Sequence, residues 1–456
     1  TTEIYTLSLH DALPISMKLR DAFRLHPLPR LALTGSGGKT SALFQLAGEW
    51  DGPVLLTTTT HLSVEQAQRA SHHWMVKDPR ELVERETDLL QPGSTLITSA
   101  EGADGRTPGA SVEVLAALVE IADTYGLPLL VEADGSRMLP LKVPAEHEPA
   151  VPVWADTVVV VAGLSALGRP LTAEWVHRPE RFAALADAPL GSPISAEMIA
   201  RVLVSSQGGM KGIPPGARRI ALLNQADTPE QAAAAAEIAA LLQQHYDAVV
   251  CASLQHGRVE AVYERACAVI LAAGKSERFG APKVLLDWSG KPLVRRSAEG
   301  ALQAGLETVV VTGAHDREIR AALEGLPVQI VANTRWEEGQ STSLQAGLAA
   351  VGNAGSVIFL LADQPFASAE VLHALLDAHQ RTLAPVIAPR VNGRRANPVL
   401  FDQVTFTDLE NVRGDQGGRA VMTHWPVTYV DVDDARLLVD IDTPEDYRRL
   451  LEAGDE

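Results

Sequence analysis

Cysteine is almost absent from this 456-residue chain, which contains only Cys251 and Cys267 and no CxxC pair. Two isolated cysteines provide neither a disulfide framework nor a cysteine zinc site, and they suit a reducing compartment such as the cytoplasm. No run approaches 18 apolar residues, so we expect no membrane span. The formal net charge of −18 argues against a nucleic-acid partner, because a phosphate backbone attracts a basic surface.

Residues 1–16, TTEIYTLSLHDALPIS, lack the basic start and the long apolar stretch of a signal peptide. They resemble a translated sequencing-adapter fragment, and Met17 reads as the start of the natural chain. We therefore expect residues 1–16 to be a non-native leader that takes no part in the fold. The remaining length exceeds one ordinary domain, since a domain averages about 150 residues.

Short apolar runs alternate with helix-like segments along the rest of the chain. The expected strands are 31–33, 54–56, 96–98, 127–132, 158–162 and 219–223 in a first series, and 268–271, 308–312, 328–332, 357–361 and 427–432 in a second. The Ala-rich stretches 112–121 and 231–243 read as helices. This alternation predicts an α/β fold of two tandem domains, each a mainly parallel sheet flanked by helices. The expected divisions are a P-loop-like domain (17–258), a helix-like connector (259–266) and a Rossmann-like domain (267–456).

A loop of small residues follows the first strand of the second series, where 271–283 reads LAAGKSERFGAPK. Small side chains let the backbone approach a triphosphate and offer its N–H groups as ligands. The expected nucleotide contacts are Leu271, Ala272, Ala273 and Gly274. Arg278 and Lys283 add positive charge where phosphate charge has to be neutralised. The alternative is an ordinary strand-to-helix turn with charged residues on the surface.

Carboxylates follow two later strands of the same series. Asp363, in LADQP, comes directly after 357–361, and Asp442, in DIDTPEDY, follows 427–432. Both stand where ligands bind in α/β sheets, and Mg²⁺ prefers such oxygen ligands. Either carboxylate could alternatively do no more than cap a helix.

Together these segments resemble the molybdenum cofactor cytidylyltransferases, members of the nucleotidyltransferase superfamily. The matching segments, in the family's order, are LAAGKSERFGAPKVLL (271–286), WEEGQSTSLQAGL (336–348), LADQP (361–365), RANPVLF (395–401), GDQGGRA (414–420) and DIDTPEDY (440–447). One departure is Ala396, where the family usually has Gly.

The resemblance implies a reaction in which CTP donates CMP to the molybdopterin phosphate with release of pyrophosphate. It implies catalytic roles for Arg278, Lys283, Asp363 and Asp442, with Mg²⁺ held by the two acids. Further contacts are implied at Gly339, Ser341 and Ser343 for the nucleotide and at Asn397, Asp415 and Arg419 for the acceptor. In this family LAAG tends to accompany CTP and LAGG to accompany GTP, so Ala273 favours CTP.

A second glycine-rich loop lies near the start of the chain, where 34–41 reads TGSGGKTS between an expected strand and helix. The backbone N–H groups, a lysine and a hydroxyl suit a nucleoside triphosphate with Mg²⁺. The expected contacts are Gly35, Gly37, Gly38, Lys39, Thr40 and Ser41. Leu33 replaces the extra glycine of the long phosphate loop, so this is a compact variant, reminiscent of amide-forming ATP ligases. The alternative is a structural glycine turn.

Polar residues follow two other strands of the first series. Glu132 and Asp134 are suited, with Thr40, to hold Mg²⁺. Asn224 and Asp227 have the spacing of the guanine-reading motif of GTPases, although Gln225 stands in place of the usual lysine. The alternative is a capped turn. The bound nucleotide is thus expected to be ATP or GTP.

TTTTHL (57–62) and VEADGSRMLPLKVPAEHEP (131–149) resemble the YqeC-type accessory proteins of selenium-dependent molybdenum hydroxylases. This resemblance covers about 24–258 and implies a molybdenum hydroxylase as partner. The hypothesis is a bifunctional cytoplasmic protein: a nucleotide-binding accessory domain fused to a cytidylyltransferase. Two alternatives stay open: a nucleotidyltransferase using GTP or another acceptor, and a carrier that hands over the finished cofactor without turnover.

Overall fold

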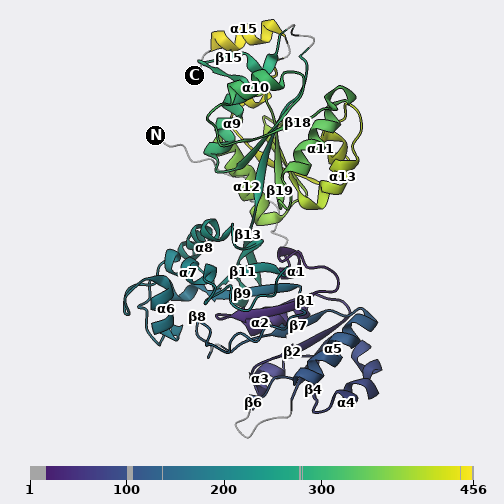
Figure 1. Cartoon of the computed structure of the whole chain (residues 1–456), viewed down its shortest axis with the longest axis vertical. Coiled ribbons are helices and arrows are strands. Elements are labelled where there is room, and N and C mark those ends of the chain that lie inside the picture. The colour runs from purple at the N-terminus through teal and green to yellow at the C-terminus, as the bar shows by residue number, and fades with distance from the viewer. Residues whose placement is uncertain are drawn as a thin grey trace. The chain divides into compact units, whose positions relative to one another are not determined.

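Two compact units make up the chain, one ending at Tyr263 and the other beginning at Glu264. The computed structural model describes residues 17–99, 106–135, 137–276, 279, 281–441 and 443–453. The predicted leader 1–16 and the predicted catalytic residues Arg278 and Asp442 lie outside the described residues. Figure 1 labels the helices and strands of both units.

The N-terminal unit is built on a nine-stranded sheet in the order β13-β12-β11-β9-β1-β7-β2-β5-β4. Every neighbouring pair from β4 to β12 is parallel. The strands are β1 (Arg30–Gly35), β2 (Pro53–Thr58), β4 (His72–Met75), β5 (Gly93–Thr98), β7 (Leu129–Glu132), β9 (Thr157–Gly163), β11 (Arg218–Asn224), β12 (Ala248–Ser253) and β13 (Arg258–Glu264). Because β1 lies between β9 and β7, the glycine loop after it opens at the centre of the carboxyl edge.

Helices pack on this sheet in two groups. Helix α5 packs with β2, β5 and β7, and α6 to α8 pack with β9, β11 and β12. The helices are α1 (Leu19–Ala22), α2 (Lys39–Ala47), α3 (Val64–Ala67), α4 (Pro79–Glu84), α5 (Val112–Tyr125), α6 (Pro179–Ala186), α7 (Ala196–Val204) and α8 (Pro229–Leu242). The local sequence sets the ends of α5: the Ser111 hydroxyl accepts the N–H of Val114, and Gly126 ends the helix at φ +64°. Short elements are β3 (Leu62–Ser63), β6 (Arg106–Thr107), β8 (Leu141–Lys142), β10 (Val176–His177), η1 (Glu86–Leu90), η2 (Leu164–Ala166) and η3 (Leu254–His256).

The C-terminal unit is built on a mixed eight-stranded sheet in the order β18-β17-β14-β19-β22-β20-β21, with β23 also paired to β20. The neighbours from β18 to β19 are parallel, and β22 runs antiparallel to β19 and β20. The strands are β14 (Ala266–Ala272), β17 (Glu307–Thr312), β18 (Gln329–Ala332), β19 (Ser356–Leu361), β20 (Val386–Val391), β21 (Arg394–Arg395), β22 (Val399–Asp402) and β23 (Val427–Asp431); β15 (Asp287–Trp288) pairs with β16 (Lys291–Pro292).

Both faces of this second sheet are covered by helices. Alternate residues of β14 divide between two cores: Ala268 and Ile270 pack with α9, α10 and α12, whereas Cys267 and Val269 pack with α11, α13 and α14. Figure 1 shows α9 and α12 on one side of the sheet and α11 and α13 on the other. The helices are α9 (Leu293–Gln303), α10 (Asp316–Ala322), α11 (Gln340–Ala350), α12 (Ala369–Thr382), α13 (Phe406–Asn411), α14 (Arg419–Met422) and α15 (Pro444–Ala453), with η4 (Lys283–Leu285), η5 (Trp336–Glu338), η6 (Gln403–Thr405) and η7 (Ala435–Leu438).

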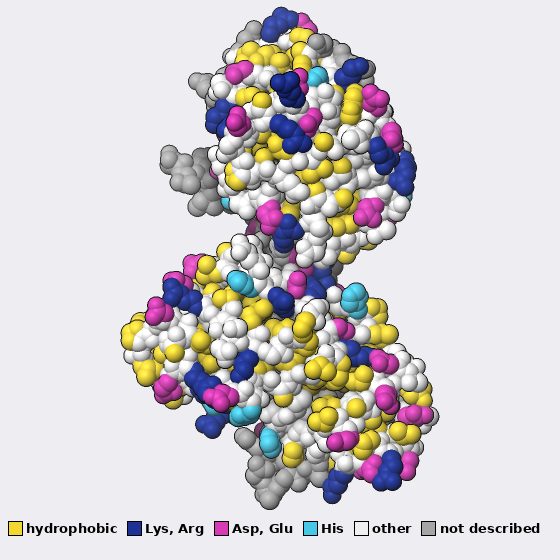
Figure 2. All heavy atoms as spheres, viewed as in Figure 1, with side chains coloured by type: hydrophobic (Ala, Val, Ile, Leu, Met, Phe, Trp, Pro, Cys, Tyr) yellow, Lys and Arg dark blue, Asp and Glu magenta, His cyan; other side chains and the backbone are white. Residues whose placement is uncertain are grey.

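The predicted α/β class with large, mainly parallel sheets is confirmed. The prediction of a helix-like connector at 259–266 is wrong, because 259–264 belong to β13 and β14 begins at Ala266. No helix within the described ranges is long and apolar enough to cross a lipid bilayer. Figure 2 shows lysine and arginine side chains interspersed with acidic ones over the visible face of each unit.

Candidate functional sites

The loop after β14 lies at the carboxyl edge of the C-terminal sheet, between the ends of β17 and β19. Ala273 is buried, and its carbonyl oxygen accepts a 3.1 Å hydrogen bond from the N–H of Ala314. Gly313 makes this contact possible, since a Cβ there would lie 2.5 Å from the same oxygen. An added Cβ at Gly274, in contrast, would meet nothing within 4 Å. The backbone of Gly274 is therefore accessible to a phosphate.

Lys283 and Asp363, two of the predicted catalytic residues, form an ion pair in which Nζ lies 2.6 Å from Oδ2. Asp363 follows β19, and Leu361 of that strand is in register with Leu271 of β14. The pair therefore lies beside the loop that is predicted to bind the nucleotide. It brings together an ammonium, which binds phosphate oxygens, and a carboxylate, which binds Mg²⁺.

A chain of amide side chains extends from this edge. The Nδ2 of Asn397 donates a 2.9 Å hydrogen bond to the Oε1 of Gln364, the residue that follows Asp363. The Nε2 of Gln364 in turn donates to the carboxylate of Asp440. Asn397, predicted to contact the acceptor, is thus tied to the segment that carries the predicted metal ligand.

A cavity of about 650 Å³ opens next to these residues in the C-terminal unit. Its lining residues are Leu271, Gln340, Leu344, Phe359, Leu361, Arg395, Asn397, Val399, Phe401, Asp415, Gln416, Gly417, Gly418, Arg419, Ala420, Met422, Thr423 and His424. The structure thus brings together all three predicted acceptor contacts, Asn397, Asp415 and Arg419. The cavity also contains Arg395, which the sequence analysis did not single out although it begins the RANPVLF segment.

Two predicted contacts stand apart from this cavity. Ser341 and Ser343 are buried, and the hydroxyl of Ser343 accepts a 3.0 Å hydrogen bond from the Nδ2 of Asn333. Neither serine is among the lining residues, where Gln340 and Leu344 of the same helix stand instead. Gly339 has φ +113° and packs against Gly414, because a Cβ at Gly339 would lie 2.5 Å from the Gly414 carbonyl carbon. These residues therefore hold the start of α11 against the 414–420 segment.

Ala396, the departure from the family pattern, does not reach the cavity. Its side chain packs in a small apolar cluster with Val371, Val391 and Leu437. Arg395 lines the cavity and Ala396 does not, so the extra methyl group lies outside the cavity.

The glycine loop of the N-terminal unit packs closely against the ends of β9 and β11. Gly35 and Gly37 have φ values of +86° and +82°, and a Cβ at Gly35 would lie 2.2 Å from the carbonyl oxygen of Val161. Helix α2 begins at Lys39 directly after the loop, as predicted. Its first turn contains Thr40 and Ser41. The arrangement presents a helix N-terminus and three glycines at the strand edge, the geometry of an anion site.

Lys39 lies among acidic groups at this loop. Its Nζ is 2.8 Å from the carbonyl oxygen of Gly35, 3.4 Å from Asp134 and 3.9 Å from Glu132. The hydroxyl of Thr40 donates a 2.8 Å hydrogen bond to Glu132. Burial raises the pKa of Glu132, opposed by the charge of Lys39 and the bond from Thr40. The predicted Mg²⁺ ligands of this unit, Thr40, Glu132 and Asp134, thus meet around one lysine.

Asn224 and Asp227 lie beyond the end of β11. The Nδ2 of Asn224 donates a 2.6 Å hydrogen bond to the carbonyl oxygen of Gly37, and its Oδ1 accepts the N–H of Leu254. Asn224 therefore positions the glycine loop. The carboxylate of Asp227 accepts a 2.5 Å hydrogen bond from the hydroxyl of Ser253.

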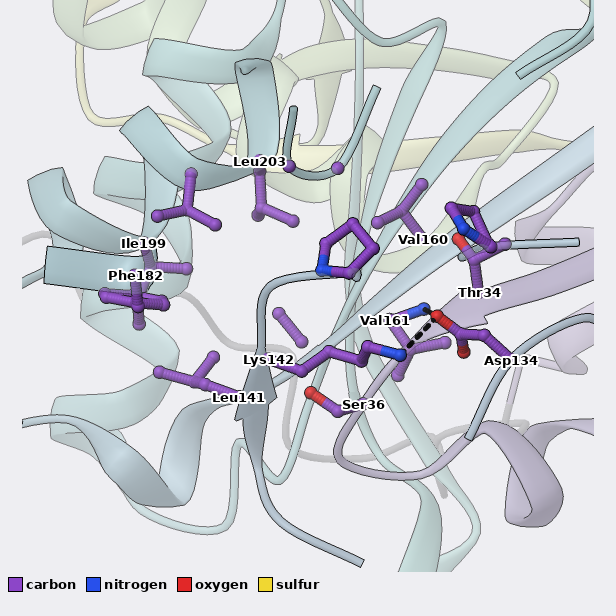
Figure 3. Close-up of a pocket in the computed structure, with 17 residues that line it drawn as sticks. Thr34, Ser36, Asp134, Leu141, Lys142, Val160, Val161, Phe182, Ile199 and Leu203 are labelled. Carbon is purple, nitrogen blue, oxygen red and sulfur yellow. Dashed lines mark hydrogen bonds and ion pairs between the residues drawn. The ribbon is translucent and has the colours of Figure 1, made fainter. Parts of the chain in front are cut away.

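Behind the loop, the Nζ of Lys142 forms an ion pair with the Oδ2 of Asp134 at 2.9 Å, as Figure 3 shows. The cavity drawn there has a volume of about 30 Å³, room for no more than a couple of water molecules. Ser36, Asp134 and Lys142 line it together with apolar side chains such as Phe182 and Ile199. This cavity is therefore too small to hold a nucleotide.

Lys142 also contacts Glu148, which accepts hydrogen bonds from Arg178 at 2.8 Å and from the Ala145 N–H at 3.1 Å. Burial alone would raise the pKa of Glu148, but these bonds and the charge of Lys142 outweigh it and lower the pKa to about 2. The network joins three residues of the segment 142–148 to Arg178, which lies 30 positions after Glu148.

Glu148→Gln is expected to lower the free energy of unfolding of the N-terminal unit at pH 7 by roughly 1–2 kcal/mol, allowing for solvent screening. A carboxylate whose pKa is lower in the folded state stabilises the fold above its unfolded pKa, near 4.3. This contribution fades as the pH falls from about 4.5 toward 2. Urea unfolding at pH 7 and pH 3.5 measures this contribution. An equal difference in the free energy of unfolding between variant and wild type at both pH values would contradict the lowered pKa of Glu148.

No group of three or more His, Cys, Asp or Glu gathers at one point in the described part of the chain. Of the residues predicted to hold Mg²⁺, the described part of the chain contains Asp363 in the C-terminal unit, and Thr40, Glu132 and Asp134 in the N-terminal unit. Mg²⁺ is commonly bound through one or two carboxylates, with phosphates and water completing the octahedron. These donor sets fit a metal that arrives with a nucleotide.

Known proteins resemble each unit. Residues 31–180 match the YqeC protein family, and residues 268–429 match the family described as the MobA-like NTP transferase domain. The chain is 34% identical over 221 residues to YqeC of Escherichia coli, which spans 47% of this chain and 83% of that protein. It is also 34% identical over 194 residues to nicotine blue oxidoreductase of Paenarthrobacter nicotinovorans, spanning 40% and 95%. The chain belongs to the YqeC and MobA-like NTP transferase families.

The MobA-like C-terminal unit is accordingly a nucleotidyltransferase. It is related to the molybdenum cofactor cytidylyltransferase of Escherichia coli, which is 25% identical over 183 residues, 39% of this chain and 92% of that protein. Both resemblances seen in the sequence, one for each unit, are confirmed. The relatives' names differ in the chemistry that they state, so the substrates have to be inferred from the site residues.

Proposed function

We propose that the C-terminal unit transfers CMP from CTP to the terminal phosphate of molybdopterin. The observation that carries this proposal is the Lys283–Asp363 pair, placed where the β14 loop adjoins the cavity of about 650 Å³. A loop for the triphosphate and a separate cavity for a bulky acceptor are what such a transfer needs. The relative named molybdenum cofactor cytidylyltransferase supports this combination of substrates.

In the proposed reaction, an oxygen of the acceptor phosphate bonds to the α-phosphorus of CTP. The bond from that phosphorus to the oxygen of the β-phosphate breaks, and pyrophosphate leaves. The attacking oxygen is already an anion, so no side chain has to remove a proton. Lys283, with Arg278 of the same loop, would neutralise charge on the α-phosphate and the leaving group. Mg²⁺ on Asp363 and Asp442 would add a Lewis acid.

The proposed preference for CTP depends on the loop after β14. Ala273 faces Gly313, and a Cβ at Gly313 would lie 2.8 Å from the Ala273 methyl group. A glycine at position 273 would remove this methyl group and widen the gap between the two loops. In this proposal the methyl group of Ala273 favours the smaller pyrimidine base, with a GTP-using transferase as the second candidate.

Pyrophosphate release by the full chain tests the proposal, with CTP, GTP, ATP or UTP as donor and Mg²⁺ and molybdopterin present. We expect release with CTP to exceed release with each other nucleotide by at least about tenfold, and to require molybdopterin. Equal rates with GTP would contradict the base preference. If the chain binds molybdopterin but releases pyrophosphate from none of the nucleotides, the result would favour a carrier of the cofactor over a transferase.

For the N-terminal unit we propose a Mg²⁺-dependent site for a purine nucleoside triphosphate, used in the maturation of a molybdenum hydroxylase. Gly35, Gly37, Gly38 and Ser41 would surround the phosphates, and Lys39 and Thr40 would contact them and the metal. The contact of Asn224 with Gly37 supports this proposal, because it links the phosphate loop to the loop suited to hold a base.

The proposed base is guanine, which offers two N–H donors to a carboxylate at Asp227. The bond from Ser253 orients this carboxylate. Gln225 does not extend over the base site as a lysine would: its Oε1 accepts a 2.7 Å hydrogen bond from Ser165. ATP therefore remains the second candidate. Calorimetric titration of the full chain with MgGTP and MgATP decides between them, and no binding of either would make the loop structural.

A further inference from the structure

Two arginines line the cavity of the C-terminal unit without acidic partners. Within the described ranges, no carboxylate oxygen lies within 4.0 Å of the guanidinium nitrogens of Arg395 or Arg419, whereas many other arginines form such pairs. The hydrogen bond of Arg395 goes from Nη1 to the sulfur of Met422, 3.3 Å away, a weak acceptor. Asp415 is the one acid among the lining residues of the described cavity.

The positive charge of Arg395 is unfavourable in the absence of a ligand. Arg395 is half-buried, and burial lowers its pKa, with the charge of Arg419 acting in the same direction. A guanidinium loses hydration on burial, and a second positive charge nearby adds repulsion. A doubly negative group placed between the two arginines would remove both costs, so the arrangement suits an anion.

One wall of the cavity is apolar and suited to rings. Phe359 and Phe401 meet edge to face with ring centroids 5.9 Å apart, and Leu344 lies on the same side of the sheet. Gly418 packs on Phe401, since a Cβ there would lie 2.7 Å from the ring. This contact holds Arg419, the next residue, at the edge of the aromatic wall. A volume of about 650 Å³ accommodates a molecule of several fused rings.

We infer that Arg395 and Arg419 bind the terminal phosphate of the acceptor, a phosphomonoester dianion carried by an uncharged ring system. This inference rests on the proposed transfer and adds Arg395 as the residue that selects a dianion. Leu271 and Leu361 line the same cavity at the strand ends beside Asp363, so a phosphate held here faces the nucleotide loop. Planar guanidinium groups bind phosphate oxygens in pairs, which orients the phosphate as well as attracting it.

Binding of 4-nitrophenyl phosphate to the full chain at pH 8, measured by calorimetry, tests this site without turnover. Arg395→Met keeps the apolar stem and removes the charge, and we expect it to weaken binding at least about tenfold. Arg395→Lys should bind with intermediate affinity because it keeps the charge but not the paired geometry. The matched control is Arg394→Met, since Arg394 is the exposed neighbour on β21 and is absent from the cavity.

4-Nitrophenyl sulfate has the same ring and one negative charge, and the wild type should bind it at least about tenfold more weakly. Equal binding of the two probes, wild-type affinity in Arg395→Met, or no binding by the wild type would each overturn the inference. Thermal unfolding checks that the variants are folded.

A second readout separates this inference from the proposed function. In the transfer assay Arg395→Met should raise the KM for the acceptor about tenfold and leave the KM for CTP unchanged. If 4-nitrophenyl phosphate binding depends on Arg395 but pyrophosphate is released from no nucleotide, the anion site is supported and the proposed CMP transfer is contradicted. If Arg395→Met transfers CMP with an unchanged KM for the acceptor, the proposed CMP transfer is supported and the anion site is contradicted.

Discussion

Asp363→Asn is expected to reduce CMP transfer by at least about a hundredfold while the C-terminal unit stays folded. The substitution keeps the size of the side chain but removes the charge that pairs with Lys283 at 2.6 Å and that would hold Mg²⁺. Because both the metal and the lysine would act on the phosphates in the proposed reaction, one neutral side chain would disturb two sources of charge stabilisation. Initial rates at saturating CTP and Mg²⁺ measure the effect.

Asp377→Asn is the matched control for this prediction. Asp377 lies on α12 and pairs at the surface with Arg381 at 3.0 Å, away from the carboxyl edge of the sheet. It should retain wild-type rates and almost all of its stability, since an exposed pair contributes little. Turnover near the wild-type rate in Asp363→Asn would show that this carboxylate does not take part in the transfer.

Lys39→Met is expected to weaken binding of a nucleoside triphosphate to the N-terminal unit by about a hundredfold. The variant lacks the ammonium that would meet the terminal phosphates, and Glu132 and Asp134 then repel the ligand. It should also destabilise the unit by about 3–5 kcal/mol, because buried carboxylates lose a cation. Calorimetry with MgGTP and MgATP, below the unfolding temperature, measures the affinity.

Lys142→Met separates these two effects. Lys142 is equally buried and pairs with the same Asp134 at 2.9 Å, but it lines the small cavity behind the loop. It should lose similar stability and retain the triphosphate. Equal loss of binding in both variants would mean that the Lys39 effect is structural, and wild-type binding in Lys39→Met would remove the site. CMP transfer should be unchanged in both.

Most strands could be predicted because each is a short apolar run buried on both faces. The run 158–162 is an example: every residue of β9, Thr157–Gly163, is buried. The segment 259–266 has no such run, because β13 lies at the edge of its sheet and only Ala261 and Val262 are buried. Its conformation depends on pairing with β12 more than on its own residues, and its sequence alone suggested a helix.

The site was predictable in part. LAAG and LADQP mark the two strand ends, and the structure adds that Lys283 and Asp363, 80 positions apart, meet as an ion pair. The nucleotide contacts at Ser341 and Ser343 stay predictions, and the structure adds that both side chains are buried while Gln340 and Leu344 of the same helix line the cavity. A short motif does not determine which side of its helix faces a cavity that residues from other segments form.

The sequence by itself determined the α/β class, the two units and the positions of the two glycine-containing loops that follow a strand. These are local properties: apolar periodicity, and glycines such as Gly35 whose positive φ other residues rarely adopt. Only the tertiary structure decided which charges are paired. Arg395 and Lys142 look alike in the sequence, yet among the described residues Arg395 has no acidic partner and Lys142 has two. The balance of charge around a buried group depends on distances between segments far apart in the chain, and folding alone sets those distances.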